Sequence, residues 1–161
     1  MAAVGNGAEI AQLEQRLDQA MGEVFGTMIG LSCSRTESAA PMEGQTIAAL
    51  IGLAGAMTGT LVLQSESSAA MHVSDLMTGM ATTEVDATVR DAMGEMANMV
   101  AGAWKGYDPA LSSSCLLSTP TVVVGNRYEL FSRRATVRID RAYGVEGSVF
   151  SVAVACERAE Q

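Results

Sequence analysis

The chain has 161 residues, a length that suits one domain or two halves that share one core. Apolar residues make up 48% of it and aromatic residues only 4%, so the core must rely on Met, Ala, Val and Leu side chains. The formal net charge of −8 argues against partners that are themselves anionic, namely nucleic acids and anionic membrane surfaces.

Neither the N-terminus nor the cysteines indicate export. Residues 1–9 lack the basic region and apolar run of a signal peptide, and no apolar stretch reaches membrane-spanning length. Cys33, Cys115 and Cys156 are far apart and odd in number, which is typical of buried free thiols in a reducing compartment. We therefore expect a cytoplasmic protein whose residues 1–9 form a flexible N-terminus.

Helical spacing of apolar residues predicts a first long helix over residues 10–31. The following stretch, residues 32–45, has the composition of a loop. Residues 46–53 and 59–64 then have the pattern of strands, and a turn through residues 55–58 would join them into an antiparallel hairpin.

Two further helices are predicted in the middle of the chain. One begins among the N-cap candidates of residues 65–68 and runs to about Met80. The other, the principal helix, covers Val89–Lys105, and Thr82 or Thr83 can cap it.

Three strands are predicted after the principal helix. Residues 114–124 form a strand that is interrupted at Pro120, while residues 133–140 and 148–156 alternate in polarity. The predicted fold class is therefore α+β, with an antiparallel sheet and two long helices packed on it. Residues 10–157 would form a single domain and residues 158–161 a frayed tail.

The principal helix has two faces of opposite character. Its polar face carries Asp91, Glu95, Asn98, Gly102 and Lys105. Glu95 and Asn98 stand three residues apart, so their side chains lie one above the other. Glycines 94 and 102 are predicted beside them, away from the core. Because an interior glycine costs about 1 kcal/mol relative to alanine, two of them here indicate a helix surface that another surface approaches.

The sequence does not favour several other kinds of catalytic site. The single His72 has no carboxylate or thiol at ligand spacing, so neither a metal site nor a histidine-activated nucleophile is indicated. We interpret His72 as a partly buried helix residue. Asn98 cannot ionise, which excludes a glycosidase-like pair of carboxylates with Glu95. The sequence also contains no P-loop and no dinucleotide-binding fingerprint.

The pattern Asp91-x-x-Gly94-Glu95-x-x-Asn98-Met99-x-x-Gly102 resembles the active-site helix of the CheC/CheX family of chemotaxis phosphatases. Residues 118–125 resemble the strand and loop that follow this helix in the CheX branch. The order of elements extends the resemblance over about residues 10–157, which implies a pseudo-duplicated CheC/CheX-like domain.

An internal similarity bears on the number of sites. Residues 17–23 and 89–95 share the string Ala-Met-Gly-Glu, which places Glu23 opposite Glu95 but Gly26 opposite Asn98. Some members of the resembled family carry two Glu-x-x-Asn pairs, and CheX-type members carry one. We therefore expect one site per chain and a degenerate copy on the first helix.

The resemblance implies a phosphatase that removes the phosphoryl group from the aspartate of a CheY-like response regulator. Asn98 would orient the attacking water and Glu95 would form a salt bridge with a lysine of the regulator. Gly94 and Gly102 would keep the helix surface low for the partner. Mg²⁺ would be supplied by the regulator, and no metal or cofactor of the chain's own is expected.

Three further expectations concern partners. Asp91 and Lys105 lie at the rim of the polar face, where charges mostly tune encounter. CheX-type relatives also imply a homodimer formed through the sheet. The alternative function is a non-catalytic adaptor like the flagellar switch components of the same fold; Asn98 favours the phosphatase, because an adaptor has no need of an amide beside the glutamate. A receiver outside chemotaxis remains open.

Overall fold

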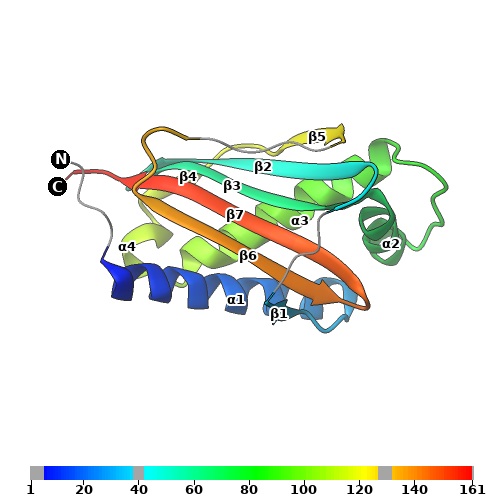
Figure 1. The fold of residues 1–161 in the computed structure, drawn as a ribbon, viewed down its shortest axis with the longest axis horizontal. Helices are drawn as coiled ribbons and strands as arrows, with labels where there is room; N and C mark the ends of the chain where they lie inside the picture. Colours follow the sequence, from blue (N-terminus) through cyan, green and yellow to red (C-terminus); the bar gives the residue numbers. More distant parts are fainter. Residues whose placement is uncertain (1–5, 38–41, 127–131, 161) are drawn as a thin grey trace.

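A seven-stranded antiparallel sheet and two long helices form the fold of this computed structural model, which describes residues 6–37, 42–126 and 132–160 (Figure 1). The predicted α+β class is confirmed. In chain order the elements are α1 (Gly7–Ile29), β1 (Ser34–Thr36), β2 (Thr46–Gly55), β3 (Met57–Glu66), α2 (Ser67–Thr78), α3 (Ala87–Gly106), α4 (Pro109–Ser112), β4 (Cys115–Leu117), β5 (Thr121–Gly125), β6 (Val137–Val145) and β7 (Ser148–Arg158).

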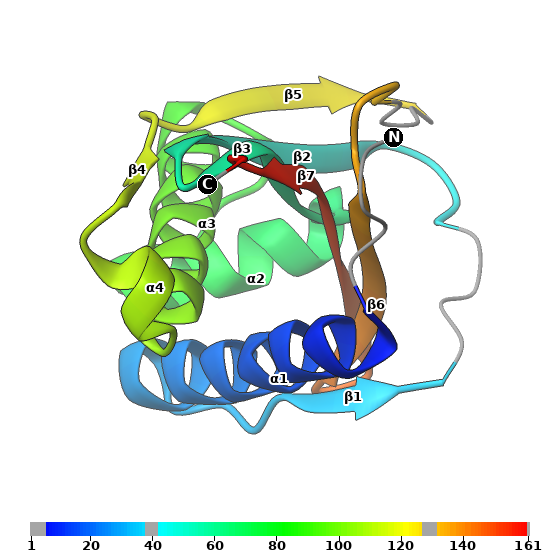
Figure 2. The same cartoon turned by 90° about the vertical axis from the view of Figure 1, so that its left-hand side faces the viewer.

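The sheet has the strand order β1-β6-β7-β3-β2-β4, and β5 also pairs with β2. Every pairing is antiparallel. The helices lie on one face of the sheet, with α1 along β6 and α3 along β2 (Figures 1 and 2). β4 and β5 follow the same edge of β2 on either side of Pro120, as the interrupted strand predicted.

The core lies between the helices and the sheet. The indole N–H of the fully buried Trp104 on α3 donates to the Leu13 carbonyl on α1 at 3.0 Å, which joins the two long helices. Phe25 on α1 packs edge to face on Phe150 of β7, with ring centroids 5.1 Å apart. Side chains alternate between the two faces of the sheet along each strand, so every second residue of a strand faces the helices and contributes to the core.

The helix ends differ from those predicted. Asn6 caps α1, because its side chain accepts from the backbone N–H groups of Ala8 and Glu9. Residues 7–9 are therefore helical and the predicted start at Ile10 is late; residues 1–5 lie outside the described residues. At the other end of the chain, β7 continues to Arg158, which pairs with Met57, and the Ala159 N–H donates to the Ala56 carbonyl at 3.0 Å. The predicted frayed tail, residues 158–161, therefore begins too early.

The N-cap of α3 is Asp86, so the predicted threonine caps are wrong. The Asp86 carboxylate accepts from the Val89 N–H at 3.0 Å. Thr82 is instead bonded to Asp75 Oδ1 through both its hydroxyl, at 2.7 Å, and its backbone N–H, at 2.9 Å. Asp75 of the preceding helix, α2, thus bonds the threonine that was expected to cap α3.

Two strands differ from the prediction. β1 lies in the stretch predicted as loop. β6 begins at Val137 and continues to Val145, whereas the predicted strand ends at Asp140. The extension pairs with β7 through a tight turn at Glu146 and Gly147, both with positive φ (47° and 80°), the backbone of a type I′ hairpin.

The burial of the histidine and the cysteines agrees only in part with the prediction. His72 is exposed rather than partly buried, and its Nε2 lies 3.1 Å from Glu146 Oε2. Cys115 and Cys156 are buried free thiols as predicted, and Cys33 is partly buried. Within the described residues, no helix is both long enough and apolar enough to span a bilayer.

Candidate functional site

The polar face of α3 points away from the core at the β2 side of the molecule. Its inward face packs on α1, α2 and the sheet and is fully buried at Met93, Met96 and Trp104. Asp91 and Glu95 are exposed, while Asn98 is half-buried. The predicted division of this helix into two faces is confirmed for these residues.

Glu95 and Asn98 carry polar groups that are not used by the fold. Neither the Glu95 carboxylate nor the Asn98 carboxamide has a hydrogen-bond or ion-pair partner among the described residues. Residues three apart on a helix share a face, so the two groups lie about one turn from each other. They form a small polar surface on a convex helix, suited to a macromolecular partner.

Gly94 lies in a different environment from that predicted. It is buried rather than open, and the surface that approaches it belongs to the same chain. A Cβ at this position would lie 3.1 Å from Pro120 Cγ and 3.6 Å from Val122 Cγ2. The expected open position is therefore wrong for Gly94. It holds for Gly102, where no atom of another described segment lies within 4 Å of the position that a Cβ would occupy.

Pro120 is the residue of this surface that the sequence did not identify. It belongs to the connection between β4 and β5, which crosses from the β2 edge onto α3 (Figure 2). Ser118 fixes the connection to Gly52: its N–H donates to the Gly52 carbonyl at 2.9 Å and its Oγ accepts from the Gly52 N–H at 2.8 Å. In the sequence this residue stands out only as the interruption of a strand and as part of the resemblance of residues 118–125, neither of which places it against α3.

The rim residues of the polar face differ in their engagement. Lys105 Nζ donates to the Ser112 carbonyl at 2.7 Å, which holds α4 against the end of α3. Asp91 has no partner among the described residues. Asp91 is therefore free to meet a partner's charge, whereas Lys105 would have to leave Ser112 to do so.

The corresponding glutamate on α1 is engaged within the fold. The Tyr107 hydroxyl donates to Glu23 Oε2. Desolvation and this hydrogen bond raise the pKa of Tyr107 to about 12. Glu23 thus contacts the end of α3, while its counterpart Glu95 has no such contact; the proposed duplication stays a prediction.

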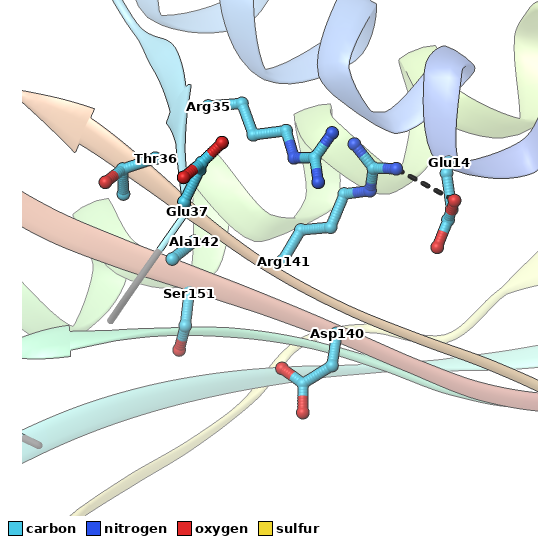
Figure 3. A pocket seen from close by; sticks show the side chains of 8 residues that line it. All are labelled: Glu14, Arg35, Thr36, Glu37, Asp140, Arg141, Ala142 and Ser151. Carbon is cyan, nitrogen blue, oxygen red and sulfur yellow. Dashed lines mark hydrogen bonds and ion pairs between the residues drawn. The ribbon is translucent and has the colours of Figure 1, made fainter. Parts of the chain in front are cut away.

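The described part of the chain gives little support to a metal site or to a nucleophilic thiol. No group of three His, Cys, Asp or Glu side chains there could hold a metal ion. Burial raises the pKa of Cys33 and of Cys156 to about 12, so these thiols are not activated nucleophiles. The pocket in Figure 3, about 270 Å³ in volume, lies between α1, β1 and β6 and includes neither Glu95 nor Asn98.

Comparison with known families decides the classification. The model of the family described as chemotaxis phosphatase CheX matches residues 47–140, more than half of the chain and all of the polar face of α3. The chain belongs to the CheX family. No curated protein sequence matches it.

Solved structures of CheX proteins share the fold. CheX from Vibrio vulnificus has a TM-score of 0.79 at 21% identity, covering 92% of this chain and 98% of that chain. CheX from Desulfovibrio desulfuricans has a TM-score of 0.76 at 19% identity, covering 91% and 99%. A CheX–CheY–BeF₃–Mg²⁺ complex from Borrelia burgdorferi has a TM-score of 0.73 at 14% identity, covering 89% and 97%. At these identities the likeness establishes the architecture.

Proposed function

We propose that this CheX-family protein hydrolyses the aspartyl phosphate of a CheY-like receiver domain, with Asn98 and Glu95 of α3 as the residues that act on it. The observation that carries the proposal is the free carboxamide and free carboxylate, one turn apart on an outward helix face. The Borrelia burgdorferi complex supports it, because there a CheX protein of the same fold is bound to CheY with BeF₃ and Mg²⁺.

Asn98 would act by positioning water. An amide does not ionise near neutral pH, so Asn98 cannot serve as a general base, but its oxygen and nitrogen can bond to water. The oriented water attacks phosphorus, the bond from phosphorus to the aspartate oxygen breaks, and inorganic phosphate leaves with the carboxylate restored. Such phosphoryl transfer depends on positioning and electrostatics, as with the glutamine that orients water in GTPases.

Glu95 would fix the approach of the receiver. Its exposed carboxylate, free of internal partners, is available for a salt bridge with a receiver lysine. We assign Mg²⁺ to the receiver, where it would neutralise charge on the phosphoryl group. Asp91, Gly102 and Lys105 surround the pair, and we propose that they contribute to docking rather than to the reaction.

Single substitutions separate the two roles. Asn98→Ala should lower the maximal rate of phosphate release on the order of 10²-fold, the usual cost of removing one preorganised polar group, while the affinity for the phosphorylated receiver is retained. Glu95→Ala should weaken that affinity about tenfold, or 1.4 kcal/mol. Turnover is measured against receiver concentration for both variants, with binding measured on a receiver held in its BeF₃ form.

Matched controls come from exposed residues elsewhere. Gln19→Ala removes an exposed amide from α1, and Glu84→Ala removes an exposed carboxylate before α3; both should leave turnover unchanged. Thermal melts of all four variants should place them within about 1 kcal/mol of the parent, because three of the sites are exposed and the half-buried Asn98 has no hydrogen-bond partner to lose among the described residues. Full turnover by Asn98→Ala would contradict hydrolysis at this site and favour the adaptor.

A further inference from the structure

The Pro120 ring lies on α3 at Gly94, one helical turn before the proposed water-orienting residue Asn98. Residues four apart on a helix share a row, with Cβ positions about 6 Å from each other, so Gly94 and Asn98 are neighbours in one row. The Pro120 ring fills the place where a side chain at Gly94 would stand. The ring is thus packed against α3 one turn before Asn98.

Helix geometry directs Asn98 toward this ring. Side chains of an α-helix lean toward its N-terminus and cover the turn before their own Cα. Asn98 therefore leans over Gly94, where no side chain of its own helix intervenes. Its half-buried state contrasts with the exposed Glu95 on the same face. Asn98 has no hydrogen-bond partner among the described residues, so packing against its neighbours is what can restrict the half-buried carboxamide.

Hydrogen bonds and strand pairing fix the connection, residues 118–120, to β2. Two hydrogen bonds join Ser118 to Gly52, and the Ser118 hydroxyl donates to the Thr119 carbonyl at 2.8 Å. Just after Pro120, Thr121 is paired with Leu50 of β2. The proline itself has a fixed φ. Ser118, Thr119 and Pro120 are themselves exposed, yet the segment is held at both ends by β2.

We infer that Pro120 is a positioning residue for Asn98: its ring, seated on Gly94, limits the rotamers of Asn98 and holds the carboxamide outward before a receiver binds. The expected effect on kcat rests on the proposed function. The restriction of the Asn98 side chain by Pro120 concerns the protein without its partner. Preorganising a group that must orient water saves the entropy of ordering it in the reaction.

The first measurement needs no receiver. The side-chain NH₂ signal of Asn98 is assigned by its loss in Asn98→Ala, and its ¹⁵N order parameter is measured in the parent and in Pro120→Ala. We expect the order parameter to fall in Pro120→Ala and to be recovered in Pro120→Val, which refills the space. Pro109→Ala, an exposed proline of α4, serves as the control and should change nothing.

The second measurement is turnover of a phosphorylated receiver. Pro120→Ala should lower kcat roughly fivefold through lost preorganisation, with KM retained and kcat restored in Pro120→Val. Gly94→Ala probes the same contact from the helix side, since its methyl group would push the ring by a few tenths of an ångström. It should shift the Asn98 signal and lower kcat, whereas Gly26→Ala, an exposed glycine of α1 with open space around it, should not.

The outcomes separate this inference from the proposed function. An unchanged Asn98 order parameter in Pro120→Ala overturns the inference, and so does a loosened amide with unchanged kcat. A parent without phosphatase activity defeats the proposed function, and the order parameter still decides whether Pro120 holds Asn98. If Pro120→Ala does not fold by thermal melt, Gly94→Ala supplies both measurements, because alanine favours the helix.

Discussion

At the scale of single residues, burial keeps the thiols in their protonated form. The pKa of Cys156, which is 1% exposed, is raised from an ordinary value of 9.0 to about 12, chiefly by desolvation. The pKa of Cys33 is raised to a similar value by burial and by the nearby Asp18 carboxylate. A thiol in the unfolded chain therefore loses its proton at a lower pH than the same thiol in the folded protein.

This difference predicts weakening of the fold in alkali. Between about pH 9 and pH 12 the unfolded state binds fewer protons, so the free energy of unfolding falls as pH rises, whereas below pH 9 the contribution is fully present. One such thiol contributes up to about 1.4 kcal/mol per pH unit. Denaturant unfolding at pH 8 and pH 10 should show a smaller fall for Cys156→Ala than for the parent. Equal falls would contradict the shift.

At the scale of elements, α1 is joined to β6 by a charged cluster. Arg141 of β6 bonds Glu14 and Asp18 of α1, each at 2.8 Å, and the Tyr143 hydroxyl donates to Asp18 at 2.6 Å. The Arg141 side chain is only 11% exposed. The Arg35 side chain lines the same pocket, and its guanidinium has no hydrogen-bond or ion-pair partner among the described residues (Figure 3).

The two arginines form a matched pair for testing this cluster. Arg141→Met keeps the bulk but leaves two partly buried carboxylates without their cation, so the free energy of unfolding should fall by about 2–3 kcal/mol. Arg35→Met should change it by less than about 0.5 kcal/mol. Urea unfolding of both variants measures the difference. Similar losses in the two would show that the ion pairs do not stabilise the α1–β6 contact.

At the scale of the whole molecule, the sheet has an edge that is only partly covered. β1 pairs with Ala142, Tyr143 and Gly144 of β6, and no strand in the described part of the chain pairs with residues 137–141 on that side. An edge with unpaired backbone groups is a site where another chain can add a strand. The homodimer expected from the resemblance stays a prediction, and this stretch is where we place it.

Light scattering at micromolar concentration should therefore give twice the mass of one chain. Dilution should return the monomer of 16.7 kDa. A mass of one chain at every concentration would contradict assembly through the sheet. It would leave the α3 site unaffected, because the polar face of α3 lies toward the β2 side of the fold and not at β6.

The sequence by itself determined the local features of this protein. Periodicity predicted both long helices, the β2–β3 hairpin and the strand broken at Pro120, because the period of apolar residues reports which face each residue occupies. The same pattern placed Glu95 and Asn98 together on the outward face of α3. Spacing along one helix suffices for that, since it depends on no other segment.

Only the tertiary structure decided which distant segments meet. Gly94 and Gly102 look alike in the sequence, yet Pro120 covers the first, while no other described segment comes within 4 Å of a Cβ at the second. Asp86 caps α3, while the candidate cap Thr82 is bonded to Asp75 of α2. Arg141 of β6 meets its counter-charges on α1, more than 120 residues earlier in the chain. Local periodicity assigns a residue to a face, but its partner depends on how helices and strands from separate parts of the chain pack together.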